Sequence, residues 1–436
     1  MTEDPLLTPD RRVLAGTPTL AEQVVEAEVG AARLWLLRTE VRDVVSFRGS
    51  LEPAPDLATE DDLAQALLVD LLDKGTRQRD RFALAEALEG RGAELSFYTD
   101  ALRIGFGGRA LAADLPDVLA LLAEQLREPA LDEAEFDKAK KQAIAAVRQA
   151  MDAPASQAAG ALSRRLYPPD HPNYIRTPEA EIARLTALTI EDVRRFHAAR
   201  VGGDGLRIAL VGDLDPQRTA RAVEGVLGDW AAHGQPARFA DEATPTAPGR
   251  ADVAIADRPN LNVRLGHPLA LRRQHDDYLA VFAANFALGG NFSARLMQTV
   301  RDAHGLTYSI GSMLRGVTVE HGGHWLVHVT LSGPNLERGV EATRAVVQQF
   351  VEEGIGADEL GAVQETLAGQ HVVGMATTGG LAARLLTNAE RGFDVGYLDR
   401  YPDLVRALTP EAVTDAARRH FRPGDLHTVV AGTLPA

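Results

Sequence analysis

An internal repeat at an offset of 220 residues constrains the fold of this chain more than any other feature. The segment Leu188–Val193 (LTIEDV) in the first half resembles Leu408–Val413 (LTPEAV) in the second. Each places a Thr where it can cap a helix, and a Glu in the first turn, where the helix dipole favours negative charge. A polar turn and an apolar strand follow, Leu206–Val211 and His427–Ala431. Helix, turn and strand in the same register predict two copies of one domain.

The segment between the two copies has the composition of a linker. Residues 231–250 hold three prolines among Gly, Ala and Thr. Because proline fixes φ and lacks an N–H donor, the segment is expected to be an extended tether. We therefore expect a first domain at 1–230, a linker at 231–250 and a second, homologous domain at 251–436, each within the usual size range.

Each half begins with strand-like segments and continues with helix-like ones. In the first half, the patterns predict strands at 31–48 and 93–107 and helices at 61–73, 80–90, 115–126 and 131–151. In the second half, they predict strands at 263–270, 307–314 and 323–331 and helices at 277–288, 293–303, 336–353 and 357–368. This order predicts the α+β class, with two homologous domains that each form a mixed, largely antiparallel sheet with helices packed on one face.

Composition excludes several classes of function. Net charge is −15, which disfavours nucleic acid and anionic membrane as partners. The absence of cysteine excludes disulfides, thiolate metal ligands and a cysteine nucleophile. Neither a secretory leader nor a run of about eighteen apolar residues is visible, so a cytoplasmic location is the expectation.

Short motifs spread along most of the chain carry a family resemblance. They occur in a fixed order at Leu72–Thr76, Gly90–Ala93, Asp170–Pro172, Leu188–Val193, Val211–Asp213, Gly289–Leu296 and Val300–Ser309. Together they resemble the pitrilysin/insulinase superfamily, which includes the mitochondrial processing peptidases, in its small bacterial two-domain form. The resemblance implies a processing-peptidase-like metallohydrolase fold and a role in peptide hydrolysis.

The zinc motif of that family is degenerate in this chain. Active members carry His-x-x-Glu-His on the helix before the Lys-Gly-Thr phrase, and this window holds Ala66, Val69 and Asp70 at the three ligand and base positions. The family's third ligand, a Glu on a later helix, is missing from the corresponding segment Ala143–Val147. Since a zinc site needs three or four protein ligands, we expect no metal in this chain and an aliphatic, filled pocket instead. The resemblance places zinc in a partner subunit.

The second half keeps another part of the family's apparatus. Active complexes use an Arg and a Tyr seven positions apart, and Arg301 and Tyr308 match them. We expect Ser293 to cap a helix that ends near Arg301, and Gly305 to allow the reversal into a strand that begins at Tyr308. A guanidinium and a phenol both donate hydrogen bonds, so the pair is suited to an oxyanion or a substrate backbone.

Two weaker signals concern binding. The family adds its substrate as a strand at a sheet edge, where the usual Asn-Ala phrase corresponds here to Ser96 and Phe97, a departure that questions substrate binding. In the second half, His321, His324 and His328 have a spacing that could hold an adventitious metal, although surface histidines on a strand are the more common explanation.

The resulting hypothesis is a non-catalytic subunit of a heterodimeric zinc metallopeptidase. Its partner would be a homologous His-x-x-Glu-His subunit, its substrate a peptide or unfolded polypeptide, and its catalytic contribution Arg301 and Tyr308, acting in trans. The alternatives are a structural or assembly protein, or a peptide-binding holdase, that keeps only the peptidase fold. A stable homodimer would favour the structural alternative.

Overall fold

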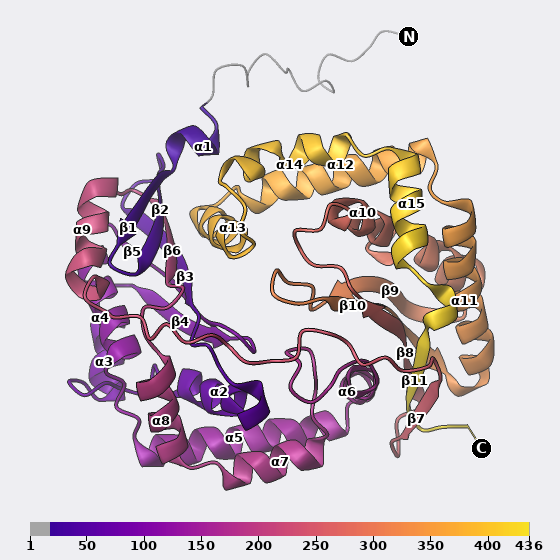
Figure 1. Cartoon of the computed structure of the whole chain (residues 1–436), viewed down its shortest axis with the longest axis horizontal. Coiled ribbons are helices and arrows are strands. Elements are labelled where there is room, and N and C mark those ends of the chain that lie inside the picture. Colours follow the sequence, from indigo (N-terminus) through magenta and orange to yellow (C-terminus); the bar gives the residue numbers. More distant parts are fainter. Residues whose placement is uncertain (1–17, 436) are drawn as a thin grey trace.

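Residues 18–435 are described by the structure, a computed structural model, and they contain two β-sheets (Figure 1). The first sheet has six strands in the order β1-β2-β6-β3-β5-β4. Its strands are β1 (Val25–Val29), β2 (Ala32–Arg38), β3 (Val44–Leu51), β4 (Glu94–Thr99), β5 (Ile104–Leu111) and β6 (Arg207–Gly212). Neighbouring strands are antiparallel except for the parallel pair β2 and β6.

The second sheet repeats this plan. It has five strands in the order β7-β11-β8-β10-β9, and only β7 and β11 are parallel. The strands are β7 (Arg250–Ala254), β8 (Asn260–Leu269), β9 (Thr307–Arg315), β10 (Gly323–Ser332) and β11 (His427–Gly432). Five strands of the first sheet, β2-β6-β3-β5-β4, therefore match the whole of the second. The predicted α+β class and the duplicated, largely antiparallel sheet are confirmed.

The helices also follow one order in the two halves. The first half has α1 (Leu20–Gln23), η1 (Leu57–Thr59), α2 (Asp61–Leu71), α3 (Arg81–Glu89), α4 (Leu115–Arg127), α5 (Glu133–Met151), α6 (Pro154–Leu166), α7 (Pro178–Ala187), α8 (Ile190–Arg200) and α9 (Pro216–Leu227). The second has α10 (Tyr278–Gly289), η2 (Met297–Ala303), η3 (Gly333–Asn335), α11 (Leu336–Glu353), α12 (Ala357–Gly374), α13 (Thr378–Glu390), α14 (Gly396–Arg406), α15 (Pro410–His420) and η4 (Pro423–Asp425). In each half, five α-helices separate the last two strands along the chain. Helices α4–α8 lie between β5 and β6, and α11–α15 lie between β10 and β11.

The repeat seen in the sequence marks equivalent structure. The side chain of Thr189 accepts a hydrogen bond from the Asp192 N–H at the start of α8, and Thr409 accepts one from Ala412 at the start of α15. Both N-caps are as predicted. The strands that follow, β6 and β11, begin 220 residues apart and lie at equivalent positions in the two sheets.

One helix of each half packs against the sheet of the other half. The helix α6 of the first half packs on β8 and β11, and α13 of the second half packs on β3 and β6 (Figure 1). Around α13, the buried side chains of Trp35, Leu37, Leu385 and Leu386 form a core between the halves. A second such core, around α6, joins Leu162 to the second sheet. Helices of the same half cover the opposite face of each sheet, so the exchanged helices are an addition to the predicted arrangement.

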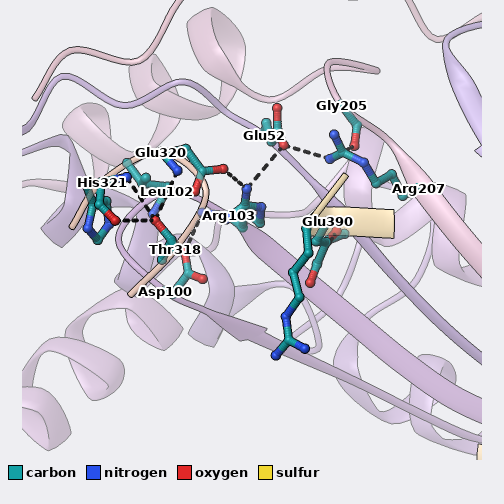
Figure 2. A network of polar contacts seen from close by, with 12 residues as sticks. Glu52, Asp100, Leu102, Arg103, Gly205, Arg207, Thr318, Glu320, His321 and Glu390 are labelled. Carbon is teal, nitrogen blue, oxygen red and sulfur yellow. Dashed lines mark hydrogen bonds and ion pairs between the residues drawn. The ribbon is translucent and has the colours of Figure 1, made fainter. Parts of the chain in front are cut away.

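A partly buried ion-pair network joins the turns of the two equivalent hairpins (Figure 2). Arg103, in the turn between β4 and β5, bonds to Glu320, in the turn between β9 and β10. The same guanidinium lies 3.6 Å from Glu52, whose carboxylate accepts a hydrogen bond of 2.7 Å from Arg207. Asp100 shapes the first turn by accepting the N–H of Arg103 at 2.8 Å. The two hairpin ends therefore meet at one charged junction.

Several local predictions need correction. The strands expected around 31–48 exist, but β6 lies between them, because the parallel β2–β6 pair is formed by a distant segment. The helix expected at 293–303 is a π-helix over Met297–Ala303, and Ser293 does not cap it. Instead, Asn291 accepts the N–H of Ser293 at 2.8 Å in a turn before the helix.

The inter-repeat segment contains no helix or named strand between α9 and β7 in the described chain, and its backbone forms an isolated bridge between Asp56 and Arg238. The domain boundaries at 230 and 250 stay predictions. None of the helices within residues 18–435 combines the length and apolar character needed to span a bilayer.

Candidate functional site: a degenerate metal site and an exposed Arg–Tyr pair

The three positions that the family resemblance aligns with the zinc motif lie on the second half of α2. Val69 is buried in the core of the first domain, Ala66 is half-buried and Asp70 is exposed. Partial desolvation, together with the nearby charge of Asp73, raises the pKa of the Asp70 carboxyl above its usual value. Of the three positions, only Asp70 offers an atom that could coordinate a metal. The expectation of a filled pocket fits Val69, whereas Asp70 lies outside the core.

The helix that would supply the third ligand does not restore a site. On α5, Ala143, Ile144 and Val147 pack against the same core. Methyl groups and one carboxylate do not meet the three-ligand minimum for zinc, so the residues present do not fit this metal. Within residues 18–435, the one group of three clustered metal-ligand side chains is His275, Asp277 and His420, which lies in the second half.

That group is satisfied by its own contacts. The Asp277 carboxylate accepts two hydrogen bonds from Arg419, at 2.8 and 2.9 Å, and lies 2.8 Å from His420 Nε2. Hydrogen bonding to Arg419 outweighs partial burial and lowers the pKa of Asp277 to about 2. His275 Nδ1 accepts the N–H of Asp277 at 3.0 Å. These contacts describe a charge-paired helix start, and we assign it no metal.

Gln65 fixes α2 against the hairpin beside it. Its fully buried amide donates to Thr99 Oγ1 at 2.6 Å and to the carbonyl of Asp100 at 2.7 Å. These bonds hold α2 at a defined position next to β4. Sequence reasoning missed this residue, because a single Gln within an apolar run does not by itself indicate a buried hydrogen-bonding role. The apolar residues on either side of it were the one available signal of an interior position.

The predicted pair Arg301 and Tyr308 is brought together by the π-helix and the strand after it. Arg301 lies in the last turn of η2, and Gly305 takes a left-handed φ of 63° that reverses the chain into β9. The Arg301 guanidinium carbon lies 5.1 Å from the centroid of the Tyr308 ring, a cation–π contact. Short π-helical segments are rare and occur frequently at functional sites.

Both members of the pair have uncommitted donors. Tyr308 is 84% exposed, and its hydroxyl has no hydrogen-bond partner within the described chain. The nearest acid to Arg301 is its neighbour Asp302, at 3.9 Å, and one guanidinium nitrogen lies 3.6 Å from the sulfur of Met297. Neither contact is a strong charge-assisted hydrogen bond. A guanidinium and a phenol thus lie side by side with donors free for an external acceptor.

Ser96 and Phe97 lie on β4, the edge strand of the first sheet. Within residues 18–435, β4 pairs with β5 alone, so its other edge has no strand partner. The Ser96 hydroxyl donates to the carbonyl of Gly107 at 3.2 Å, and Phe97 packs against the first-domain core. The open edge of β4 suits addition of a strand, while Ser96 bonds within its own sheet and Phe97 faces the core. Substrate binding at β4 stays a prediction.

The three histidines of the second half do not form a metal-binding cluster. His321 is buried, with Nδ1 2.9 Å from the carbonyl of Gly322, and His324 Nδ1 lies 3.0 Å from the hydroxyl of Tyr167, the C-cap of α6. Burial and a nearby Arg264 lower the pKa of His328 to about 4. His321 and His324 contact His171 and Tyr167 of the first half, whereas His328 lies against its own sheet. The trio is not among the groups of side chains that could hold a metal in the described chain.

The duplicated sheets, the positions on α2 and the exposed Arg–Tyr pair are features of a metallopeptidase-like protein. Two family models match the sequence. The insulinase model, peptidase family M16, matches residues 66–171, and the model of the peptidase M16 inactive domain matches residues 187–367. The chain belongs to peptidase family M16, in its two-domain bacterial form. The family resemblance seen in the sequence is thereby confirmed.

Individual relatives carry different descriptions. The chain is 26% identical over 356 residues to an uncharacterized zinc protease of Streptomyces coelicolor, covering 80% of this chain and 76% of that protein. It is 22% identical over 392 residues to the non-peptidase homolog YmxG of Helicobacter pylori, covering 88% and 86%. The crystal structure of a peptidase M16 inactive domain from Pseudomonas fluorescens has a TM-score of 0.85 at 22% identity, covering 95% of this chain and 98% of that one. The last comparison shows the shared fold.

Proposed function

We propose that this chain is the non-catalytic subunit of a heterodimeric zinc metallopeptidase and supplies Arg301 and Tyr308 to the active site of a His-x-x-Glu-His partner. The observation that carries the proposal is a contrast within one chain. The ligand positions hold Ala66, Val69 and Asp70, whereas the second half presents a guanidinium and a phenol with free donors. A family member called a non-peptidase homolog gives independent support for loss of activity.

The chemistry suits stabilisation of developing negative charge. When the carbonyl of a scissile peptide is attacked, its oxygen becomes anionic, and donors placed there beforehand lower the barrier. The Arg301 guanidinium and the Tyr308 hydroxyl both donate hydrogen bonds. Both groups would act on substrate held at the partner's metal, and the substrate class is a peptide or an unfolded polypeptide.

The test uses the full-length chain with a His-x-x-Glu-His homologue from the same source. Alone, the chain should bind less than stoichiometric zinc by elemental analysis and should not hydrolyse a quenched fluorescent peptide. The mixture should hydrolyse it, and Arg301→Ala should lower kcat by about 10²–10³ while the heterodimer persists in size-exclusion chromatography. Arg338→Ala, at an exposed site on α11, is the matched control. Full activity of the Arg301→Ala complex would refute the role.

Tyr308→Phe tests the hydroxyl separately from the ring. The substitution keeps the aromatic face beneath Arg301 and removes only the donor, so kcat should fall by about 10² with little change in complex stability. The same change at Tyr174, in the first half, should leave kcat unaltered. A fall in heterodimer affinity without a fall in kcat would instead make Tyr308 an interface residue.

The alternatives make different predictions for the same preparations. A structural or assembly protein would form a stable homodimer or a larger complex without a zinc-bearing homologue. A holdase would bind a fluorescent unfolded polypeptide on its own with an affinity that the partner does not change. Analytical ultracentrifugation and fluorescence anisotropy of the isolated chain distinguish these outcomes from the proposed heterodimer.

A further inference from the structure

A pocket with an unusual charge lies among four helices of the second half. It measures about 280 Å³ and lies among α10, α12, α13 and α14, which stand together in Figure 1. Its lining includes three arginines, Arg273, Arg384 and Arg391, and contains no Asp or Glu. Aromatic side chains, Tyr278, Phe282, Tyr397 and Tyr401, form much of the remaining wall.

The three guanidinium groups have no acidic partner within residues 18–435. No hydrogen bond or ion pair links any of their side chains to a carboxylate there, although each is half-buried. Arg273 lies over the Tyr278 ring, with its guanidinium carbon 3.9 Å from the centroid. Burial, and then repulsion by Arg391, lowers the pKa of Arg273 to about 9, and burial followed by Arg384 also lowers the pKa of Arg391.

Nearby acids are engaged elsewhere. Glu390, beside Arg391 in the chain, accepts the Ser50 hydroxyl at 2.7 Å in the first half. Asp394 pairs with Arg400 at 3.1 Å, and Asp399 accepts the N–H groups of α1. Glu390 attracts Arg391 electrostatically but forms no ion pair with it, so the three guanidinium groups share a partly desolvated space without a bonded carboxylate in the described chain. An anion entering the pocket would remove the repulsion among them and gain charge-assisted hydrogen bonds.

The aromatic walls of the pocket determine which kind of molecule can carry the bound anion. The Tyr401 ring stacks on His371 with centroids 4.5 Å apart, and Tyr397 stacks on Phe393 at 4.2 Å, so the rings are held in place. Rigid aromatic faces beside guanidinium groups suit a flat or apolar body that ends in a carboxylate. A volume near the lower end of ligand pockets limits the occupant to one residue-sized group.

We propose that Arg273, Arg384 and Arg391 form a binding site for a carboxylate carried on an aromatic or large apolar group, either the C-terminal residue of a peptide or a free organic acid of that kind. The site is made by this chain alone and does not depend on the proposed heterodimer. The two sources share one chemistry, a carboxylate on the arginines and a hydrophobic body between the rings.

Isothermal titration calorimetry of the full chain tests the site with three probes. N-acetylphenylalanine should bind, its primary amide should bind at least tenfold more weakly, and a hexapeptide ending in phenylalanine shows whether a longer chain adds affinity. A tighter peptide identifies the peptide end as the ligand, and equal affinities identify the free acid. Equal binding of acid and amide, or no binding of either, would overturn the proposal.

Variants separate a binding role from a structural one. Arg391→Gln and Arg273→Gln should each weaken the acid by tenfold or more, while the exposed Arg338→Gln should not. Because an unpaired charge is removed, the unliganded Arg391→Gln protein should melt no lower than the parent chain. Unchanged affinity in both pocket variants would refute the site, as would a lowered melting temperature of the unliganded Arg391→Gln protein together with retained acid binding.

Discussion

At the scale of single residues, the fold depends on a few partly buried polar side chains whose desolvation would be costly without a partner. Arg103 is the clearest example, since its guanidinium lies between Glu320 of the other half and Glu52 of its own. Both ends of the Arg103–Glu320 pair are largely buried, at 12% and 25% side-chain exposure. A buried charge is tolerated only with a partner, so each of these residues makes the other necessary.

Loss of Arg103 should therefore cost more than loss of the pair. Arg103→Met leaves Glu320 without its cation, while Glu52 keeps Arg207, and should lower the free energy of unfolding by about 3 kcal/mol. The double variant Arg103→Met with Glu320→Met should recover most of this loss, because apolar groups of similar volume replace the whole pair. Urea unfolding of the single and double variants measures the difference. A double variant as unstable as the single one would contradict this account.

At the scale of elements, the exchanged helices decide how the two copies are joined. Neither α6 nor α13 was anticipated from the sequence. Pro154 opens α6 and Gly379 and Gly380 lie in the first turn of α13, so each start is typical of a turn. The Thr377 side chain nevertheless caps α13 by accepting the Gly380 N–H at 3.0 Å. Packing on the opposite sheet stabilises these helices, and this contribution outweighs weak local propensity.

Shortening a buried side chain of α13 should show how much this helix contributes to the stability of both halves. Leu385 is 1% exposed in the core against the first sheet, and Leu385→Ala should cost about 2–5 kcal/mol. On the adjacent α12, Val373 is 73% exposed, and Val373→Ala should change stability by about 0.5 kcal/mol or less. Chemical denaturation should show one cooperative transition that shifts for Leu385→Ala. A shift confined to the second half would contradict a shared core.

At the scale of the whole molecule, acid sensitivity follows from histidines buried in neutral form. His171 and His267 are 2% and 0% exposed, and burial lowers the pKa of each to about 4. Both use a ring nitrogen as an acceptor. His171 Nδ1 accepts the Asn173 N–H at 2.9 Å, and His267 Nε2 accepts the Arg422 N–H at 3.1 Å. Protonation would remove these acceptors and place charge in the core.

Stability should therefore fall as pH falls from about 6.5 towards 4. In that window the unfolded chain, with histidine pKa values near 6.5, binds protons that the folded chain does not, and each such histidine contributes a slope of about 1.4 kcal/mol per pH unit. Above pH 6.5 this contribution is fully present and does not vary. Unfolding free energies measured from pH 5 to 7.5 should show this slope below pH 6.5. His267→Gln should reduce the slope by the contribution of one histidine, about 1.4 kcal/mol per pH unit. Exposed His304→Gln is the control, and an unchanged slope in His267→Gln would contradict the assignment.

The sequence alone was sufficient to predict what depends on local pattern and motif order. Thr189 and Thr409 predicted the starts of two equivalent helices, because an N-cap is a local interaction. The motifs around Ala66 and Arg301 indicated the family. The exchange of α6 and α13, the Arg103–Glu320 junction and the cluster of Arg273, Arg384 and Arg391 came from the tertiary structure. Each joins residues far apart in the chain, and no local period or spacing encodes which distant side chains are brought into contact when the cores form.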